Sequence, residues 1–215
     1  MPIAIISGGS FRQFETQFLT GFPKDVSFEN FSLYPTSAAQ CYVYKNGAWQ
    51  TLYAHLFTPE EKQTIIQVLE EGIKHTRIID SSTPQFGDRI EDRGAQISFS
   101  ALGQSAPIAL KRLWDPTREK RAPLQKFLID ALPECSVRVN ASSTIDITRA
   151  GITKAYGVQE FSRMVDVPVS AMLYVGDGLF EGGNDAIVKE TGIPTRQISG
   201  PEETLVCIAE LTAAL

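Results

Sequence analysis

Asp177 and Asp185 are the first residues of this chain whose types and spacing indicate chemistry. Asp177 follows an apolar run at 171–175, and three glycines separate the two acids. A buried strand that ends on an acid and then turns tightly places a carboxylate at the carboxyl edge of a sheet, where open α/β sheets bind ligands. Both carboxylates could face one Mg²⁺, a cation that prefers oxygen ligands. The alternative is a solvated Asp-Gly turn.

A second candidate site lies near the beginning of the chain, at Ser7, Gly8 and Gly9. An apolar strand at 2–7 leads into these residues, and phenylalanines at helical spacing follow from Phe11. The pattern predicts a strand, a tight turn and a helix, so the Ser7 hydroxyl and the next N–H groups would suit an anion. The alternative is a plain helix cap.

Lys154 is the third candidate, because it opens a predicted helix that runs to about residue 164. Hydrogen-bond donors, a cation and a metal ion are the parts that a transferring phosphoryl group requires. Ser7 with its glycines, Lys154 and the two aspartates supply this set. Taken alone, a lysine at such a position is more often a solvated helix residue.

The elements that must position these residues form an α/β pattern at both ends of the chain and an antiparallel α+β pattern in the middle. We expect strands at 2–7, 31–37, 40–44, 49–56, 96–102, 135–140, 143–148, 171–175 and 195–198, and helices at 11–19, 58–75, 107–114, 124–132, 152–164, 185–190 and from 201. The strand at 96–102 alternates as if one face were wet. Asn46-Gly47 predicts a hairpin turn between two strands, and Thr58 with Glu61 predicts a capping box at the start of the helix at 58–75. The pattern predicts a doubly wound core, residues 1–56 and 150–215, with an inserted domain at 57–149.

Composition restricts the function classes. With a net charge of −5 over 215 residues, the chain lacks the basic face of a nucleic-acid-binding protein. Its three cysteines are widely spaced and its histidines number two, so neither a disulfide framework nor a zinc site is expected. We see neither a signal peptide nor a membrane span, and we expect a cytoplasmic protein.

In this order and spacing the candidate motifs resemble those of the haloacid dehalogenase (HAD) phosphatase superfamily, in the subclass with an inserted α+β cap, and most closely its phosphomannomutase-like members. The motifs are 6–9, Lys154, and the run from Gly176 through 182–185. The resemblance implies that Ser7, Gly8 and Gly9 bind the phosphoryl oxygens and that Lys154 neutralises them. It also implies that Asp177 binds Mg²⁺, with Asn184 or Asp185 completing the metal site or its outer shell.

The same resemblance implies a substrate grip in the cap. Arg93 and Lys111 would hold a remote phosphate, and Thr144 and Asp146 would contact sugar hydroxyls. Gln104 stands where an arginine is expected, which weakens bidentate phosphate capture. The difference favours a phosphatase, or another phosphosugar, over a mutase that uses a bisphosphorylated sugar. For Arg93 and Lys111 the alternative is simple solvation at the surface.

The family's first motif, Asp-x-Asp, does not occur in these 215 residues. It carries the nucleophile of an aspartyl-phosphate intermediate on the central strand of the core. We therefore expect the chain as printed to be inactive. We also expect the central core strand that carries this motif to be missing. Its neighbours, at 3–6 and 171–175, would then pair directly or accept a strand from another chain, as in a homodimer with strand exchange.

The sequence thus predicts an Mg²⁺-dependent phosphatase or phosphomutase for a small phosphorylated sugar or similar phosphomonoester, with neither nucleic-acid nor membrane partners. The alternative is a non-catalytic module that keeps the phosphosugar grip. A nucleotide-binding Rossmann domain is disfavoured, because Gly-x-Gly-x-x-Gly does not follow the first strand.

Overall fold

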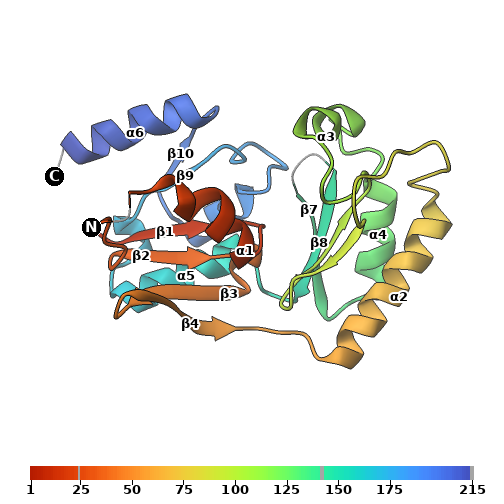
Figure 1. Ribbon diagram of the computed structural model, residues 1–215, viewed down its shortest axis with the longest axis horizontal. Helices are drawn as coiled ribbons and strands as arrows, with labels where there is room; N and C mark the ends of the chain where they lie inside the picture. Colours follow the sequence, from red (N-terminus) through yellow and green to blue (C-terminus); the bar gives the residue numbers. More distant parts are fainter. Residues whose placement is uncertain (24, 141–142, 214–215) are drawn as a thin grey trace. The chain divides into compact units, whose positions relative to one another are not determined.

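The chain divides into two units, Met1–Thr153 and Lys154–Leu215, in a computed structural model that describes residues 1–23, 25–140 and 143–213 (Figure 1). The mixed α/β class expected from the sequence is confirmed. Within these described ranges, the first unit contains two four-stranded sheets, and the second contains one pair of strands. The expected division into a core and a cap at residues 57–149 stays a prediction.

The first sheet has the strand order β1-β2-β3-β4, with β1 (Ile3–Ile6), β2 (Phe31–Tyr34), β3 (Gln40–Lys45) and β4 (Ala48–Ala54). β1 is parallel to β2, and the other neighbours are antiparallel. Between β1 and β2 the chain forms α1 (Phe11–Gln13), the π-helical η1 (Phe14–Phe18) and the 3-10 turn η2 (Leu19–Gly21). The helix expected from residue 11 is therefore present but irregular.

β1 is the end strand of this sheet, and β2 is its one ladder partner among the described strands. All four residues of β1 are apolar and partly exposed. Parallel strands are normally covered on both sides. An apolar strand with an unpaired edge is therefore open to a further strand.

One turn follows β2 and another follows β3, and the sequence predicted the one after β3. The Asn46-Gly47 hairpin between β3 and β4 is confirmed, because φ is 53° at Asn46 and 78° at Gly47, as a type I′ turn requires. The strand expected to reach Ser37 instead ends at Tyr34, since η3 (Thr36–Ala38) is a turn of three non-glycine residues with φ between 53° and 72°. Such backbone is strained and needs support from its surroundings.

The second sheet has the order β5-β6-β8-β7 and is antiparallel throughout, with β5 (Ile90–Asp92), β6 (Ile97–Ser100), β7 (Cys135–Asn140) and β8 (Thr144–Arg149). Its helices are α2 (Pro59–Thr76), α3 (Ile108–Trp114) and α4 (Ala122–Ala131). The capping box predicted for α2 is confirmed: Thr58 Oγ1 accepts from the Glu61 N–H at 3.2 Å, and Glu61 Oε2 accepts from the Thr58 N–H at 2.6 Å. β5 was missed because three residues are too few for a periodicity.

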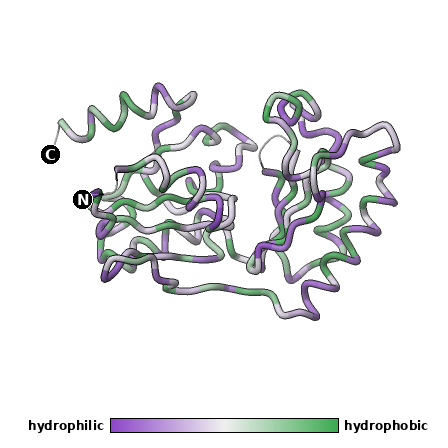
Figure 2. The backbone as a smooth tube through the Cα atoms, in the orientation of Figure 1, coloured by the Kyte–Doolittle hydropathy of each residue, from purple (hydrophilic) through white to green (hydrophobic). Residues whose placement is uncertain are grey.

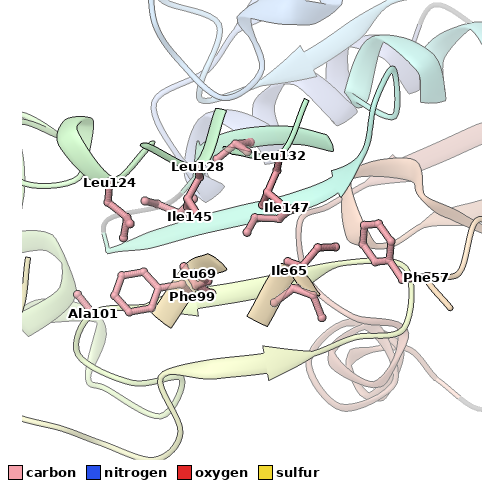
Figure 3. Close-up of a cluster of buried hydrophobic side chains, with 12 residues drawn as sticks. Phe57, Ile65, Leu69, Phe99, Ala101, Leu124, Leu128, Leu132, Ile145 and Ile147 are labelled. Atoms are coloured by element: carbon pink, nitrogen blue, oxygen red, sulfur yellow. The ribbon is translucent and has the colours of Figure 1, made fainter. Parts of the chain in front are cut away.

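One face of the second sheet packs against α2 and α4 and forms the main hydrophobic core of the unit (Figure 3). The core side chains from β6 and β8 include Ile97, Phe99, Ile145 and Ile147, and none of them is exposed. α2 contributes an apolar stripe, and Figure 2 shows hydrophobic and hydrophilic stretches alternating along this helix. Burial of this hydrophobic core is the main source of stability for this part of the chain.

The other face of the same sheet is polar, because alternate residues of a strand point to opposite faces. It carries Gln96, Ser98 and Asp146, all buried. The expectation that β6 has one wet face is therefore wrong, since every residue of β6 is buried. Buried polar side chains need hydrogen-bond partners, and the candidate site supplies them for Ser98, for Asp146 and for the amide nitrogen of Gln96.

The second unit contains α5 (Lys154–Val165), η4 (Val169–Ala171), β9 (Tyr174–Gly176), η5 (Ala186–Thr191), β10 (Thr195–Gln197) and α6 (Pro201–Ala213), and β9 is parallel to β10. The strand expected at 171–175 begins only at Tyr174, because the Ala171 N–H bonds to the Pro168 carbonyl in a 3-10 turn. β9, like β1, ends its sheet. No helix in the described ranges is long and apolar enough to cross a membrane.

Candidate active site

The loop Ser7–Gly9 is held by the left-handed turn η3. The Ser37 N–H donates to the Ser7 carbonyl at 2.8 Å, and the Thr36 N–H donates to the Gly9 carbonyl at 2.8 Å. Within the loop, the Gly9 N–H donates to Ser7 Oγ at 3.1 Å. The strained turn therefore fixes the backbone of the loop that is predicted to bind phosphate. Backbone strain of this kind tends to occur at functional sites.

Side chains of the second sheet converge on Gly8 at the middle of this loop. Arg93 Nη1 donates to the Gly8 carbonyl at 2.8 Å, and Gln96 Nε2 donates to the same oxygen at 3.1 Å. A Cβ at Gly8 would lie 3.3 Å from Asp146 Oδ2, so only glycine fits there without displacing a neighbour. The polar face of the sheet and the Ser7–Gly9 loop thus form one site.

Arg93, which is predicted to hold a remote phosphate, is surrounded by polar and charged neighbours. Its Nε and Nη2 donate to Glu91 Oε2 at 2.8 and 2.6 Å, and Nη2 also lies 3.3 Å from Gln104 Oε1. Lys111 Nζ donates to the Gln104 carbonyl at 2.8 Å. Burial lowers the pKa of Lys111, and the nearby charge of Arg93 lowers it further. A bound anion would relieve this repulsion, so the pair is suited to phosphate or carboxylate.

Asp146 is the buried acid of the polar face. Ser98 Oγ donates to its Oδ1 at 2.6 Å, and Asn140 Nδ2 donates to its Oδ2 at 2.7 Å. Burial raises the pKa of Asp146, although the Arg93 charge and these two hydrogen bonds oppose the rise. Thr144, the other predicted sugar contact, donates its hydroxyl to the Asn140 carbonyl at 2.6 Å. Its oxygen is therefore part of the same polar cluster.

In the second unit, Asp185 is the centre of a separate buried cluster. It forms an ion pair with Lys154 and accepts from the Tyr174 hydroxyl at 2.9 Å and from the Gly178 N–H at 3.1 Å. The Lys154 and Asp185 side chains are 11% and 4% exposed, so the pair is largely shielded from water. Burial, followed by the Asp185 charge, raises the pKa of Tyr174 well above its usual value. Lys154 and Asp185 therefore fix each other at the start of α5 and η5.

Asp177, the predicted magnesium ligand, is exposed, and Gln197 Nε2 donates to its carbonyl at 2.7 Å. The glycine-rich turn that follows is tight, because a Cβ at Gly183 would run into the Gly178 carbonyl. Asn184 Oδ1 also lies against Gly178. Three grouped acidic, histidine or cysteine ligands do not occur in the described part of the chain. The oxygens of Asp177 and Asn184 have the hard-donor chemistry that Mg²⁺ takes.

Sequence reasoning missed three members of the site: Gln96, Asn140 and Ser37. Gln96 donates a hydrogen bond to the Gly8 carbonyl, and Asn140 donates one to Asp146. Ser37 Oγ lies 3.8 Å from a Cβ placed at Gly8. The only signal for Gln96 was its place at the start of a strand in which polar and apolar residues alternate. Neither Asn140 nor Ser37 has a local signal, because each is defined by its contacts with distant residues.

Comparisons with known proteins were made by sequence and by structure. No protein-family model and no curated protein matches the sequence. Solved structures match closely in fold. An IMP-nucleotidase from Plasmodium falciparum, truncated at its N-terminus and bound to IMP, has a TM-score of 0.68 at 16% identity over 99% of this chain. This chain covers 59% of the nucleotidase chain, so it spans about three fifths of that protein.

Two further structures support the same fold. The protein SMU.1108c of Streptococcus mutans has a TM-score of 0.63 at 14% identity, with 99% of this chain and 86% of that one covered. The sucrose-phosphatase of Synechocystis, in complex with sucrose and phosphate, has a TM-score of 0.51 at 14% identity, with 95% and 72% covered. The resemblance to HAD phosphatases read from the sequence motifs is confirmed at the level of the fold.

Proposed function

We propose that this chain, which has the fold of the HAD phosphatases, carries the phosphate loop and substrate cap of an Mg²⁺-dependent phosphoryl-transfer hydrolase. Its substrate would be a small phosphorylated sugar or a similar phosphomonoester. The observation that carries the proposal is the convergence of Arg93, Gln96 and Asp146 on Gly8. A glycine loop faced by a cation and by hydroxyl-binding groups suits a phosphate ester of a polyol.

The roles of the individual residues follow from their contacts. Ser7, Gly8 and Gly9 would bind phosphoryl oxygens, while Arg93 and Lys111 would hold a second anionic group of the substrate. Thr144 and Asp146 would accept or donate hydrogen bonds to hydroxyls. Gln96 Oε1 is buried and has no hydrogen-bond partner in the described ranges, which favours a substrate that brings a donor to this end of the site.

Lys154, Asp177, Asn184 and Asp185 supply the remaining parts of the proposal. Asp177 and Asn184 would hold Mg²⁺, which neutralises phosphoryl charge when bound. Asp185, whose oxygens are taken up by Lys154, Tyr174 and Gly178, would act from the outer shell by orienting Lys154. Lys154 would then supply the cation that the resemblance to the HAD phosphatases implies for neutralising phosphoryl charge.

Binding of inorganic phosphate and glucose 6-phosphate, followed by ¹H–¹⁵N NMR with and without Mg²⁺, tests the proposal. We expect shifts at Gly8 and Gly9, and a roughly tenfold loss of phosphate affinity in Gly8→Ala, equivalent to about 1.4 kcal/mol. Gly21→Ala is the matched control, because a Cβ there meets nothing within 4 Å. Neither probe binding to the wild type, or equal losses in both variants, would refute the proposed site.

Turnover of p-nitrophenyl phosphate separates the enzyme from a non-catalytic phosphosugar-binding module. The 215 residues lack an Asp-x-Asp pair, so we propose that they bind without turnover and that adding an Asp-x-Asp strand produces activity. Substantial turnover by the 215 residues alone would show that a different group is the nucleophile.

The unpaired edge of β1 supports a strand-exchanged homodimer as the partner of this chain. Light scattering would show twice the monomer mass, and a monomer at all concentrations would contradict this proposal. We also propose a cytoplasmic location, consistent with three widely spaced cysteines whose number and spacing predict no disulfide framework, which cell fractionation would check.

A further inference from the structure

We propose that Arg121 is a positioning residue for the substrate-facing end of the polar face, where it fixes the ends of β7 and β8 so that Asn140 and Asp146 face Gly8. The inference rests on the proposed function and identifies what holds its hydroxyl-binding groups in place. Sequence patterns gave no reason to select Arg121, which lies just before α4.

Arg121 is one of the largest fully buried side chains of the chain and is 1% exposed. Its Nε donates to Asp115 Oδ2 at 2.7 Å, and its Nη2 donates to the Asp115 carbonyl at 3.2 Å. Asp115 also accepts from the N–H groups of Lys120 and of Arg121 itself, at 3.1 and 3.3 Å. One side of the guanidinium is therefore fixed by a carboxylate that the local backbone holds in place.

The other side of the guanidinium reaches the site. Nη1 donates to the carbonyls of Asn140 and Thr144, at 3.0 and 3.1 Å. These two residues are register partners at the end of the β7–β8 ladder. A single cationic nitrogen thus joins the last residue of one strand to the first residue of the next.

The positions of Asn140 and Asp146 depend on this join. Asn140 Nδ2 donates to Asp146 Oδ2 at 2.7 Å, and the same oxygen lies 3.3 Å from a Cβ placed at Gly8. Asn140 Nδ2 itself lies 3.8 Å from that Cβ. A chain of contacts therefore runs from Asp115 through Arg121 and Asn140 to the acid that faces the loop.

Stability alone is a weak reason for this arrangement. Burial lowers the pKa of Arg121, which reflects the cost of removing its charge from water, and a buried ion pair is often no more stabilising than packed apolar side chains. What an arginine supplies here is a planar fork that reaches a carboxylate and three carbonyls together. Lysine would keep the charge near Asp115 but would lose this geometry.

The test compares Arg121→Lys with Arg112→Lys, an exposed arginine of α3, in the full chain. The first readout is the titration of the Asp146 carboxyl in ligand-free protein by ¹³C NMR. The groups facing this carboxyl are Ser98, Asn140, Arg93 and Glu91. We expect Arg121→Lys to raise the pKa of Asp146, because withdrawal of the Asn140 donor destabilises the carboxylate. An unchanged pKa in a folded variant would overturn the proposal.

The second readout is affinity. We expect Arg121→Lys to bind glucose 6-phosphate about tenfold more weakly than the wild type and inorganic phosphate equally well, because only the hydroxyl contacts are displaced. Equal losses for both probes would show a general structural role and overturn the proposal. If Arg121→Lys does not fold, Asp115→Asn replaces it, with the same direction expected for both readouts. If the wild type binds neither probe, the proposed function fails, and the Asp146 titration still decides the role of Arg121.

Discussion

Replacing Lys154 by methionine tests the buried ion pair on which the second unit depends. The change keeps the length and the apolar stem of the side chain but leaves the Asp185 carboxylate buried without its cation. Removing one partner of a buried pair typically costs about 3–5 kcal/mol. Asp185 keeps its hydrogen bonds from Tyr174 and Gly178, so we expect the lower end, about 3 kcal/mol.

The double variant Lys154→Met/Asp185→Asn separates the cost of an unpaired charge from the cost of lost packing. Asparagine is uncharged and can still accept a hydrogen bond from Tyr174. We therefore expect the double variant to recover about 2 kcal/mol relative to Lys154→Met. Such a recovery would show that Lys154 stabilises the protein mainly by compensating the buried charge of Asp185.

Urea unfolding followed by circular dichroism measures both free energies, and the exposed Lys189→Met serves as the control, with a change within about 0.5 kcal/mol. A loss below about 1 kcal/mol in Lys154→Met, or a double variant as unstable as the single one, would refute the reasoning. Lys154 would then be free of Asp185 in solution.

Two further predictions concern the first unit. Burial raises the pKa of Asp146 in the folded protein. The protonated Asp146 should therefore add to the free energy of unfolding, relative to Asp146→Asn, at pH values below its ordinary pKa of 3.8. This contribution should be lost as the pH rises through the raised native pKa. Urea unfolding of both proteins from pH 3 to 7 measures the difference, and a difference that grows with pH would contradict the assignment. Leu69→Ala should cost about 2–5 kcal/mol, because Leu69 is fully buried in the core of the second sheet (Figure 3), whereas the exposed Glu70→Ala should change stability by about 0.5 kcal/mol or less. Thermal unfolding checks this pair, and similar melting temperatures would show that the core tolerates the cavity.

The sequence predicted those parts of the fold that depend on neighbouring residues. The capping box at Thr58 and the Asn46-Gly47 hairpin are local, and both are confirmed. The strand at 171–175 was placed too early, because the 3-10 turn after Pro168 is not visible as a periodicity. The turn Thr36–Ala38 was missed because non-glycine residues adopt positive φ only where tertiary contacts support it.

The sequence by itself also determined which chemical groups the chain contains: a serine-glycine loop, a lysine at a helix start, and a glycine-rich turn with two acids. Only the tertiary structure decided their partners. Gly8 and Arg93 are 85 positions apart, and Arg121 and Asn140 are 19 apart, yet each pair is joined by a hydrogen bond. The physical reason is that a hydrogen bond depends on distance and direction in space. The fold sets both, and the order of residues along the chain does not record them.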